Sequence, residues 1–177
     1  MHEANIRLFL ALWPGKSEQE RLHAIAHQHR PTGKCRLTAA HGLHLTLLFL
    51  GSVSPVTESC VRAITDTIYW RPFEIEFDRL GWFAQPRVMW VGCSELPAQL
   101  LSLVEGLQTG LAQCGFEPER RDFYPHITVA RKVTRPPKVK EIEPITCYFD
   151  SVVLVESRTE QQGVEYVALA SWPAQTS

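Results

Sequence analysis

Residues 44–51, with the sequence His-Leu-Thr-Leu-Leu-Phe-Leu-Gly, decide the fold of this chain. The run is short and apolar apart from His44 and Thr46, and a glycine ends it, which is typical of a strand. Since side chains on a strand alternate between its faces, His44 and Thr46 point one way while Leu45 and Leu47 point into the core. A polar His-Thr face on such a strand is costly unless it is hydrogen-bonded or functional.

The same pattern returns in the second half of the chain as His126-Ile127-Thr128-Val129. The chain has seven histidines, and the residue frequencies give a probability of roughly 0.4% that two of them meet this pattern by accident. The alternative is that each His-Thr pair only completes a polar network between strands. Two such strands facing each other would instead frame a cleft with two imidazoles and two hydroxyls.

This set of groups suits phosphate chemistry. One imidazole can take a proton from water while the other gives a proton to the leaving oxygen. The threonine hydroxyls can donate to the non-bridging phosphate oxygens and stabilise the transition state. We therefore predict His44 and His126 as the catalytic pair, with Thr46 and Thr128 as substrate ligands. The residues alone do not assign the acid and the base, because two coupled imidazoles look alike in a sequence.

The elements around the motifs indicate an α+β fold with antiparallel strands, because hairpins outnumber the crossovers that a parallel sheet needs. Ser17 and Glu20 predict a capping box for the first helix, and Ser54-Pro55 starts the second. The expected strands are 6–13, 43–53, 73–77, 87–93, 127–130, 147–156 and 164–172, and the expected helices are 17–28, 55–69 and 96–114.

The composition is that of an ordinary globular protein, with 177 residues, 45% hydrophobic and 21% charged. A net charge of −1 argues against broad coating of nucleic acid, which needs a dense basic surface. No apolar run reaches the ~18 residues of a membrane span, and no secretory signal is present. The five cysteines are odd in number and scattered, which predicts reduced thiols, neither disulfides nor a zinc site, and a cytoplasmic location.

Basic residues gather around the second motif and could grip one phosphate at the end of a chain. The distal ones can equally be a solvated basic loop. They are Arg120 and Arg121 before the motif and Arg131, Lys132, Arg135, Lys138 and Lys140 after it.

Four segments together resemble the two-histidine (2H) phosphoesterase superfamily, and within it the bacterial RNA 2′,3′-cyclic phosphodiesterases, long labelled 2′-5′ RNA ligases. The segments are 7–11 (RLFLA), 44–51 (HLTLLFLG), 87–92 (RVMWVG) and 121–131 (RDFYPHITVAR). The resemblance covers almost the whole chain. It implies a bilobal 2H phosphoesterase fold, in which two antiparallel sheets face a central cleft with helices packed outside. Residues 1–177 would then form a single domain of two pseudo-symmetric lobes.

The resemblance also implies a reaction and its partners. His44 would be the proton donor and His126 the proton acceptor in hydrolysis of RNA 2′,3′-cyclic phosphodiester ends to 2′-phosphomonoesters. No metal and no other cofactor would take part, and the enzyme would be a monomer that binds RNA ends or small cyclic nucleotides, with no membrane association. The expected substrate ligands beyond the threonines are Arg131, Arg87 and Arg121, with Phe123 stacking on a terminal base.

Three alternatives remain open at this stage. A non-catalytic RNA-end binding module on the same fold would need cations more than a pair of histidines. Ligation of 2′-5′ RNA is the formal reverse of a related phosphodiester reaction. A metallohydrolase would have to use His23, His27 and His29, for which no acidic partner is apparent in the sequence.

Overall fold

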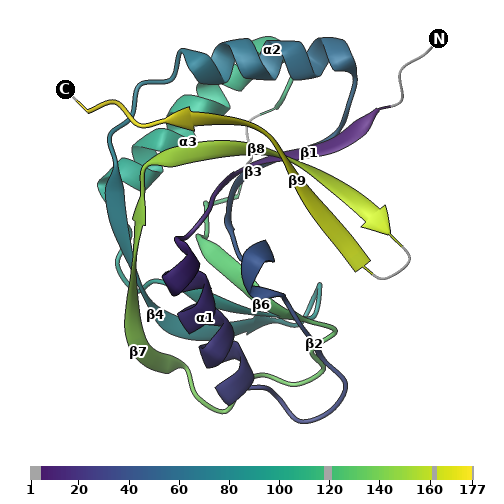
Figure 1. Cartoon of the computed structure of the whole chain (residues 1–177), viewed down its shortest axis with the longest axis vertical. Helices are drawn as coiled ribbons and strands as arrows, with labels where there is room; N and C mark the ends of the chain where they lie inside the picture. Colours follow the sequence, from purple (N-terminus) through teal and green to yellow (C-terminus); the bar gives the residue numbers. More distant parts are fainter. Residues whose placement is uncertain (1–4, 118–120, 161–162, 177) are drawn as a thin grey trace.

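The computed structural model describes residues 5–117, 121–160 and 163–176. Most elements of the described chain are strands, and the three α-helices are separated from one another by strands (Figure 1). In chain order the elements are β1 (Ile6–Leu12), α1 (Lys16–Gln28), β2 (Arg36–Leu37), the 3-10 helix η1 (Ala40–Gly42), β3 (Leu45–Val53), α2 (Pro55–Asp66), β4 (Phe73–Phe83), β5 (Val88–Gly92), α3 (Ala98–Leu111), the 3-10 helix η2 (Ala112–Cys114), β6 (His126–Arg131), β7 (Glu141–Phe149), β8 (Ser151–Glu160) and β9 (Gly163–Pro173).

The strands pair in the order β7-β4-β5-β6-β3-β1-β8-β9, with β2 added beside β6. Every pairing is antiparallel, which confirms the expected strand arrangement. The two sheets expected from the sequence are joined into one, because Leu45 of β3 pairs with Ile127 of β6. That single pair is the whole connection between β3 and β6 within the described residues, so the two halves splay apart on either side of it.

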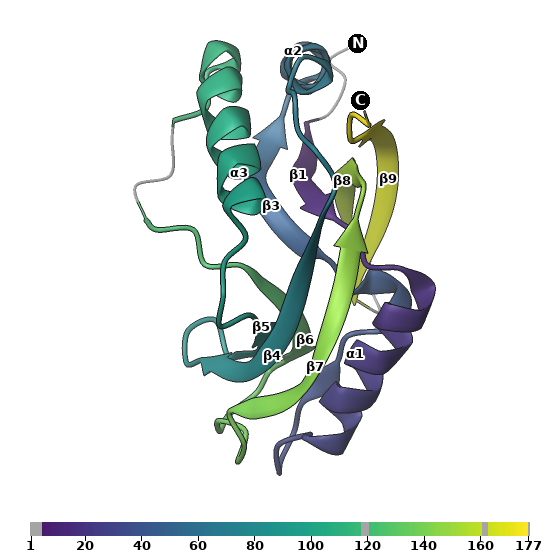
Figure 2. The same ribbon diagram turned by 90° about the vertical axis from the view of Figure 1, so that its left-hand side faces the viewer.

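The helices cover the outer faces of the two halves, as expected. Helix α1 packs against β6 and β7, whereas α2 and α3 pack against each other and against β9 and β3 respectively. Figures 1 and 2 show α1 at one end of the molecule and α2 with α3 at the other. Strand β1 therefore lies in one half of the sheet while α1, which follows it directly, covers the other half.

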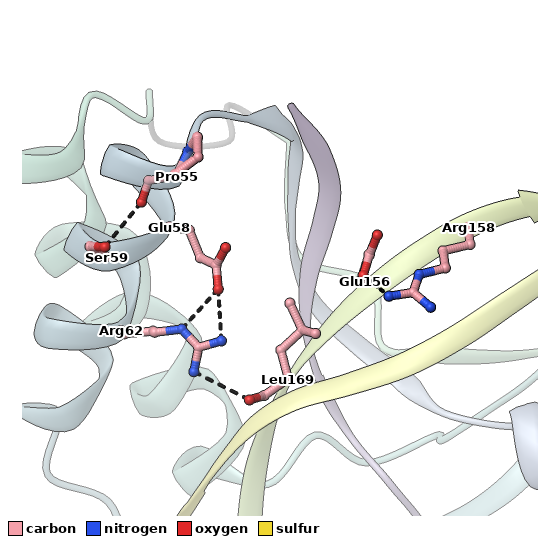
Figure 3. Close-up of polar contacts among 7 residues, drawn as sticks. All are labelled: Pro55, Glu58, Ser59, Arg62, Glu156, Arg158 and Leu169. Carbon is pink, nitrogen blue, oxygen red and sulfur yellow. Dashed lines mark hydrogen bonds and ion pairs between the residues drawn. The ribbon is translucent and has the colours of Figure 1, made fainter. Parts of the chain in front are cut away.

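Helix α2 shows how the sequence sets an element and how tertiary contacts hold it. Ser54 caps it by accepting a hydrogen bond from the Thr57 N–H at 3.2 Å. Arg62 donates to Glu58 at 2.7 Å and to the carbonyl oxygen of Leu169 in β9 at 3.2 Å (Figure 3). The second bond ties the helix to the last strand of the sheet.

Local signals were misleading at two other elements. The capping box at Ser17 is wrong, because α1 begins at Lys16 after Gly15 and the Ser17 hydroxyl donates to Glu18 instead. The expected strand 147–156 is two strands, β7 and β8, which separate at Asp150. Alternation holds only up to Phe149, because residues 152–155 of β8 are all buried, so a period of two does not describe the whole segment.

The expectation that all five thiols are reduced is also wrong. Cys60 of α2 and Cys114 of η2 form a disulfide, although 54 positions separate them in sequence. The packing of α2 on α3 brings the two residues together, so neither a CxxC spacing nor an even count announces the pair. Cys35, Cys93 and Cys147 are free. The cysteines therefore do not indicate a reducing compartment.

No helix among the described residues is both long enough and apolar enough to cross a membrane.

Candidate active site

The single pair between β3 and β6 sets the geometry of the site. Leu45 and Ile127 lie directly opposite each other and are fully buried, so both point into the core. In an antiparallel pair, the flanking residues on each strand then point to the other face. His44 and Thr46 therefore share one face with His126 and Thr128.

Both histidine rings are held by the backbone in the same way. The Nδ1 of His44 lies 2.8 Å from the carbonyl oxygen of Gly42, and the Nδ1 of His126 lies 2.8 Å from that of Tyr124. A carbonyl oxygen only accepts, so each Nδ1 carries the hydrogen. Each ring is thereby fixed in the tautomer that leaves Nε2 available for proton transfer.

Both motifs line one cleft with a volume of about 390 Å³. Thr46 and Thr128 lie beside the histidines, and neither hydroxyl has a hydrogen-bond partner among the described residues. Both hydroxyls are therefore free to donate to a ligand. Further residues reach the cleft from β1, β8 and β9, so both halves of the sheet build its wall. The lining also includes Arg7, Phe9, Thr38, Phe49, Arg131, Ser157, Thr159 and Tyr166.

The cations and aromatics expected to bind substrate separate into two groups. Arg131 lines the cleft, and its guanidinium Nη2 lies 3.5 Å from the hydroxyl of Tyr166. Arg87 and Arg121 are exposed but are not part of the cleft wall. Phe123 packs against the hydrophobic core instead of facing the cleft. The structure therefore brings Arg131 to the motifs and leaves the other three outside.

Aromatic rings enclose His44. Phe9 and Trp13 stack on it with centroid distances of 4.8 and 4.9 Å, and Tyr166 meets it edge-on at 4.9 Å. Phe9 comes from the middle of β1 and Trp13 from just beyond its end, whereas Tyr166 comes from β9. These contacts fix the ring plane and keep water away from the imidazole.

A second aromatic group supports His126. Phe83 meets the ring edge-on at 5.2 Å, and Trp90 and Tyr124 lie farther out at 6.5 Å each. The Trp90 indole lies across Gly81 and Gly92, where a Cβ would collide with it. Glycine at these two positions therefore makes room for the ring that stands behind His126.

This enclosure changes how readily the histidines take a proton. Burial lowers the pKa of His44 to about 4, and the charges of Arg131 and His126 also lower it. The hydrogen bond to the Gly42 carbonyl acts in the opposite direction. Burial also lowers the pKa of His126, again with Arg131 acting in the same direction. Both imidazoles are therefore neutral at pH 7 in the free protein, and a bound anion would raise both pKa values by offsetting the positive charge.

Sequence reasoning missed several residues of the cleft. Tyr166 contacts His44, Phe9 and Arg131 from the far end of the chain. Phe49 is 73% exposed although it belongs to the first motif segment, so it offers an open aromatic surface at the cleft. Arg7 adds a second guanidinium. Of these residues, only Phe49 has a local signal in the sequence, which is its alternation with the buried Leu50. Tyr166 and Arg7 have none, because strand pairing brings them to the site.

The alternative metal centre at His23, His27 and His29 has no support from the geometry. The Nδ1 of His23 donates to the carbonyl oxygen of Thr38 at 3.0 Å. Within residues 5–117, 121–160 and 163–176, no group of three His, Cys, Asp or Glu side chains is arranged to hold a metal ion.

Comparison with known proteins agrees with this geometry. A family model described as the 2′-5′ RNA ligase superfamily matches residues 14–161. An RNA 2′,3′-cyclic phosphodiesterase of Escherichia coli K12 is 35% identical over 136 residues, which cover 74% of this chain and 77% of that protein. A protein of the same name from Archaeoglobus fulgidus is 30% identical over 140 residues, covering 77% and 78%. The crystal structure of E. coli LigT complexed with 3′-AMP aligns with a TM-score of 0.87 at 28% identity, covering 97% of this chain and 99% of that one.

Proposed function

Because the chain belongs to the 2′-5′ RNA ligase superfamily, the group of 2H phosphoesterases, we propose that it hydrolyses the 2′,3′-cyclic phosphodiester ends of RNA. The observation that carries the proposal is the matched pair of histidines. Each is anchored through Nδ1 to a backbone carbonyl, and both line one cleft with two unpaired threonine hydroxyls. A site that only bound phosphate would need its cations but not two imidazoles held for proton transfer.

The groups support an in-line displacement at phosphorus. His126 Nε2 removes a proton from water, the water oxygen bonds to phosphorus, and the bond from phosphorus to the 3′ oxygen breaks. His44 protonates the leaving 3′ oxygen, so the product carries a 2′-phosphate and a free 3′ hydroxyl. Thr46 and Thr128 donate to the non-bridging oxygens, and Arg131 supplies positive charge.

The proposal treats residues 1–177 as one catalytic domain acting as a monomer. One chain supplies both histidines, both threonines and Arg131 to the same cleft. We also propose a cytoplasmic location from the RNA substrate alone, since the Cys60–Cys114 disulfide contradicts the reduced thiols from which the sequence indicated it. Gel filtration at the concentration of the activity assay tests the monomer.

The product identifies the reaction. We expect a cyclic-phosphate-ended oligonucleotide to give a 2′-phosphate, because that is the product that membership of the family implies; the residues of the cleft alone do not select the 3′ over the 2′ leaving oxygen. Phosphorus NMR against both monophosphate standards locates the product phosphate, and a parallel sample with chelator tests whether a metal takes part. A 3′-phosphate would reverse the assigned leaving group, and loss of activity that a divalent metal restores would refute the metal-free mechanism. Binding without turnover would favour the non-catalytic module, and joined RNA would show ligation.

The pH dependence follows from the lowered histidine pKa values. One imidazole must be neutral and the other protonated, so the rate profile is expected to be bell-shaped. The two limbs of the kcat/KM profile report the free enzyme. Because the pKa values of His44 and His126 are both lowered there, both limbs should lie below the ordinary histidine pKa near 6.5. The two limbs of the kcat profile should lie at higher pH, since the bound anion raises the pKa values of both histidines. The apparent values belong to the pair.

Measuring both profiles on one substrate checks this. Superimposable limbs for kcat and kcat/KM would contradict the argument, as would a flat profile between pH 4 and 8.

A further inference from the structure

A surface groove lies between the loop that follows α1 and the loop that follows β6, and its volume is about 570 Å³. The charged side chains that line it are all cationic. We propose that this distal basic groove, defined by Arg30, Arg135 and Lys138, binds backbone phosphates of the RNA chain whose cyclic end occupies the catalytic cleft. This inference rests on the proposed function and adds where the rest of the substrate lies.

Within the part of the chain that the structure describes, no ion pair neutralises the charges of the groove. Its lining contains no carboxylate, only polar and apolar side chains besides the three cations and His29. The ion pairs of the described residues lie elsewhere, within α2, within β4, between β4 and β7, and within β8. Arg30 instead donates to the sulfur and the carbonyl oxygen of Cys35, both at 3.3 Å. These neutral acceptors hold the guanidinium in place and leave its charge available to an anion.

The catalytic cleft adjoins a second hollow beside β2, and Arg131 in the wall of both lies four positions before Arg135 in the groove. Strand β2 pairs with the end of β6, which sets Arg36 opposite Arg131. A hollow of about 360 Å³ is lined by both of these residues and shares Thr38, Gly42, Arg131 and Tyr166 with the cleft wall. From Arg131 to Arg135 the chain can extend at most about 14 Å. The two loops then run side by side, since a Cβ at Gly33 would contact the Thr134 hydroxyl at 3.6 Å.

The β6 side of the groove starts from a fixed point. The buried Val133 donates its N–H to the carbonyl oxygen of Arg87 at 2.9 Å and accepts from the Trp82 indole at 3.2 Å. The loop therefore starts from an anchored residue, and Arg135 and Lys138 within it line the same groove as Arg30.

The chemistry of the substrate requires such an exit. A 2′,3′-cyclic phosphate lies on the last nucleotide, so the rest of the RNA leaves the cleft on the 5′ side of that ribose. Phosphates spaced along the backbone are bound by cations spaced along a groove, with little dependence on base sequence. A cyclic mononucleotide has no such phosphates, and only an oligonucleotide gains from the groove.

The test compares two substrates and two double variants. Arg135→Gln/Lys138→Gln removes two charges from the groove, whereas Lys16→Gln/Arg71→Gln removes two exposed charges elsewhere. Steady-state kinetics are measured on a 2′,3′-cyclic mononucleotide and on an oligonucleotide ending in the same group, over a range of salt. For the groove variant we expect KM for the oligonucleotide to rise roughly tenfold, as two exposed ion contacts are lost. The salt slope of log kcat/KM should become shallower by about 1.4, at ~0.7 per phosphate contact.

The mononucleotide separates the groove from the catalytic proposal. Unchanged mononucleotide kinetics in the groove variant, with a weaker oligonucleotide KM, support the inference. Equal oligonucleotide kinetics in the wild type and the groove variant overturn it and leave the catalytic proposal standing, as does an equal loss in both double variants. If the wild type turns over neither substrate, the proposed function fails. In that case, fluorescence anisotropy measures how the wild type and the two double variants bind an oligonucleotide that ends in a 2′-phosphate. The same difference in salt slope between the variants then tests the groove.

Discussion

Replacing His44 or His126 by alanine is expected to lower kcat by roughly 10²–10⁴-fold, the usual contribution of a general acid or base. Each ring keeps Nε2 available because its Nδ1 is bound to a carbonyl oxygen, and no other imidazole lines the cleft among the described residues. The double variant should lose little more than the worse single variant, because the two groups act in one step. Initial rates on a 2′,3′-cyclic nucleotide measure all three.

His23→Ala is the matched control. Its Nδ1 also donates to a backbone carbonyl, at 3.0 Å, but the ring lies outside the cleft. It should keep the wild-type rate, and circular dichroism melting should show the catalytic variants folded. Near wild-type turnover by a folded His44→Ala or His126→Ala protein would show that the two-histidine mechanism is wrong.

Removing the two threonine hydroxyls should have the next largest effect. Thr46→Val and Thr128→Val preserve the shape of the side chain and delete only the donor. In the double variant we expect kcat to fall by roughly 10²–10³-fold, comparable with the loss of an oxyanion donor. KM should change less, because the hydroxyls are proposed to bind the transition-state charge more strongly than the ground state. Each single variant gives an intermediate loss.

Thr146→Val serves as the control for this substitution, since Thr146 is an exposed strand residue on β7. A rise in KM with unchanged kcat in the double variant would assign the hydroxyls to ground-state binding instead. Rates at saturating substrate, with the concentration series needed for KM, distinguish the two results.

Much of the fold follows from patterns confined to a few neighbouring residues. The alternation in 44–47 and 126–129 predicts strands whose His and Thr share a face, and the register of β3 with β6 agrees. Ser54 and Pro55 predict the start of α2, and Gly115 adopts the left-handed conformation expected after a helix, with φ of 88°. These signals succeed because capping and strand alternation depend on local geometry.

The errors share one cause. The Cys60–Cys114 bond joins segments brought together by helix packing, and the break at Asp150 separates strands that pair with different neighbours. Phe123 lies three residues before His126 in the sequence, yet its ring packs on the core. Proximity in sequence to a catalytic residue does not decide which way a side chain faces once the chain leaves regular structure.

The sequence by itself predicts His44 and His126 as the catalytic pair, with Thr46 and Thr128 beside them, because a strand places residues two apart on one face and the motif occurs twice. Only the tertiary structure decided what surrounds them. Pairing of β9 with β8 brings Tyr166 to His44 from a distant position, and pairing of β2 with β6 sets Arg36 opposite Arg131. Burial by rings from β1 and β9 lowers the pKa of His44 to about 4. Desolvation depends on the packing of the whole molecule, so no local pattern encodes it.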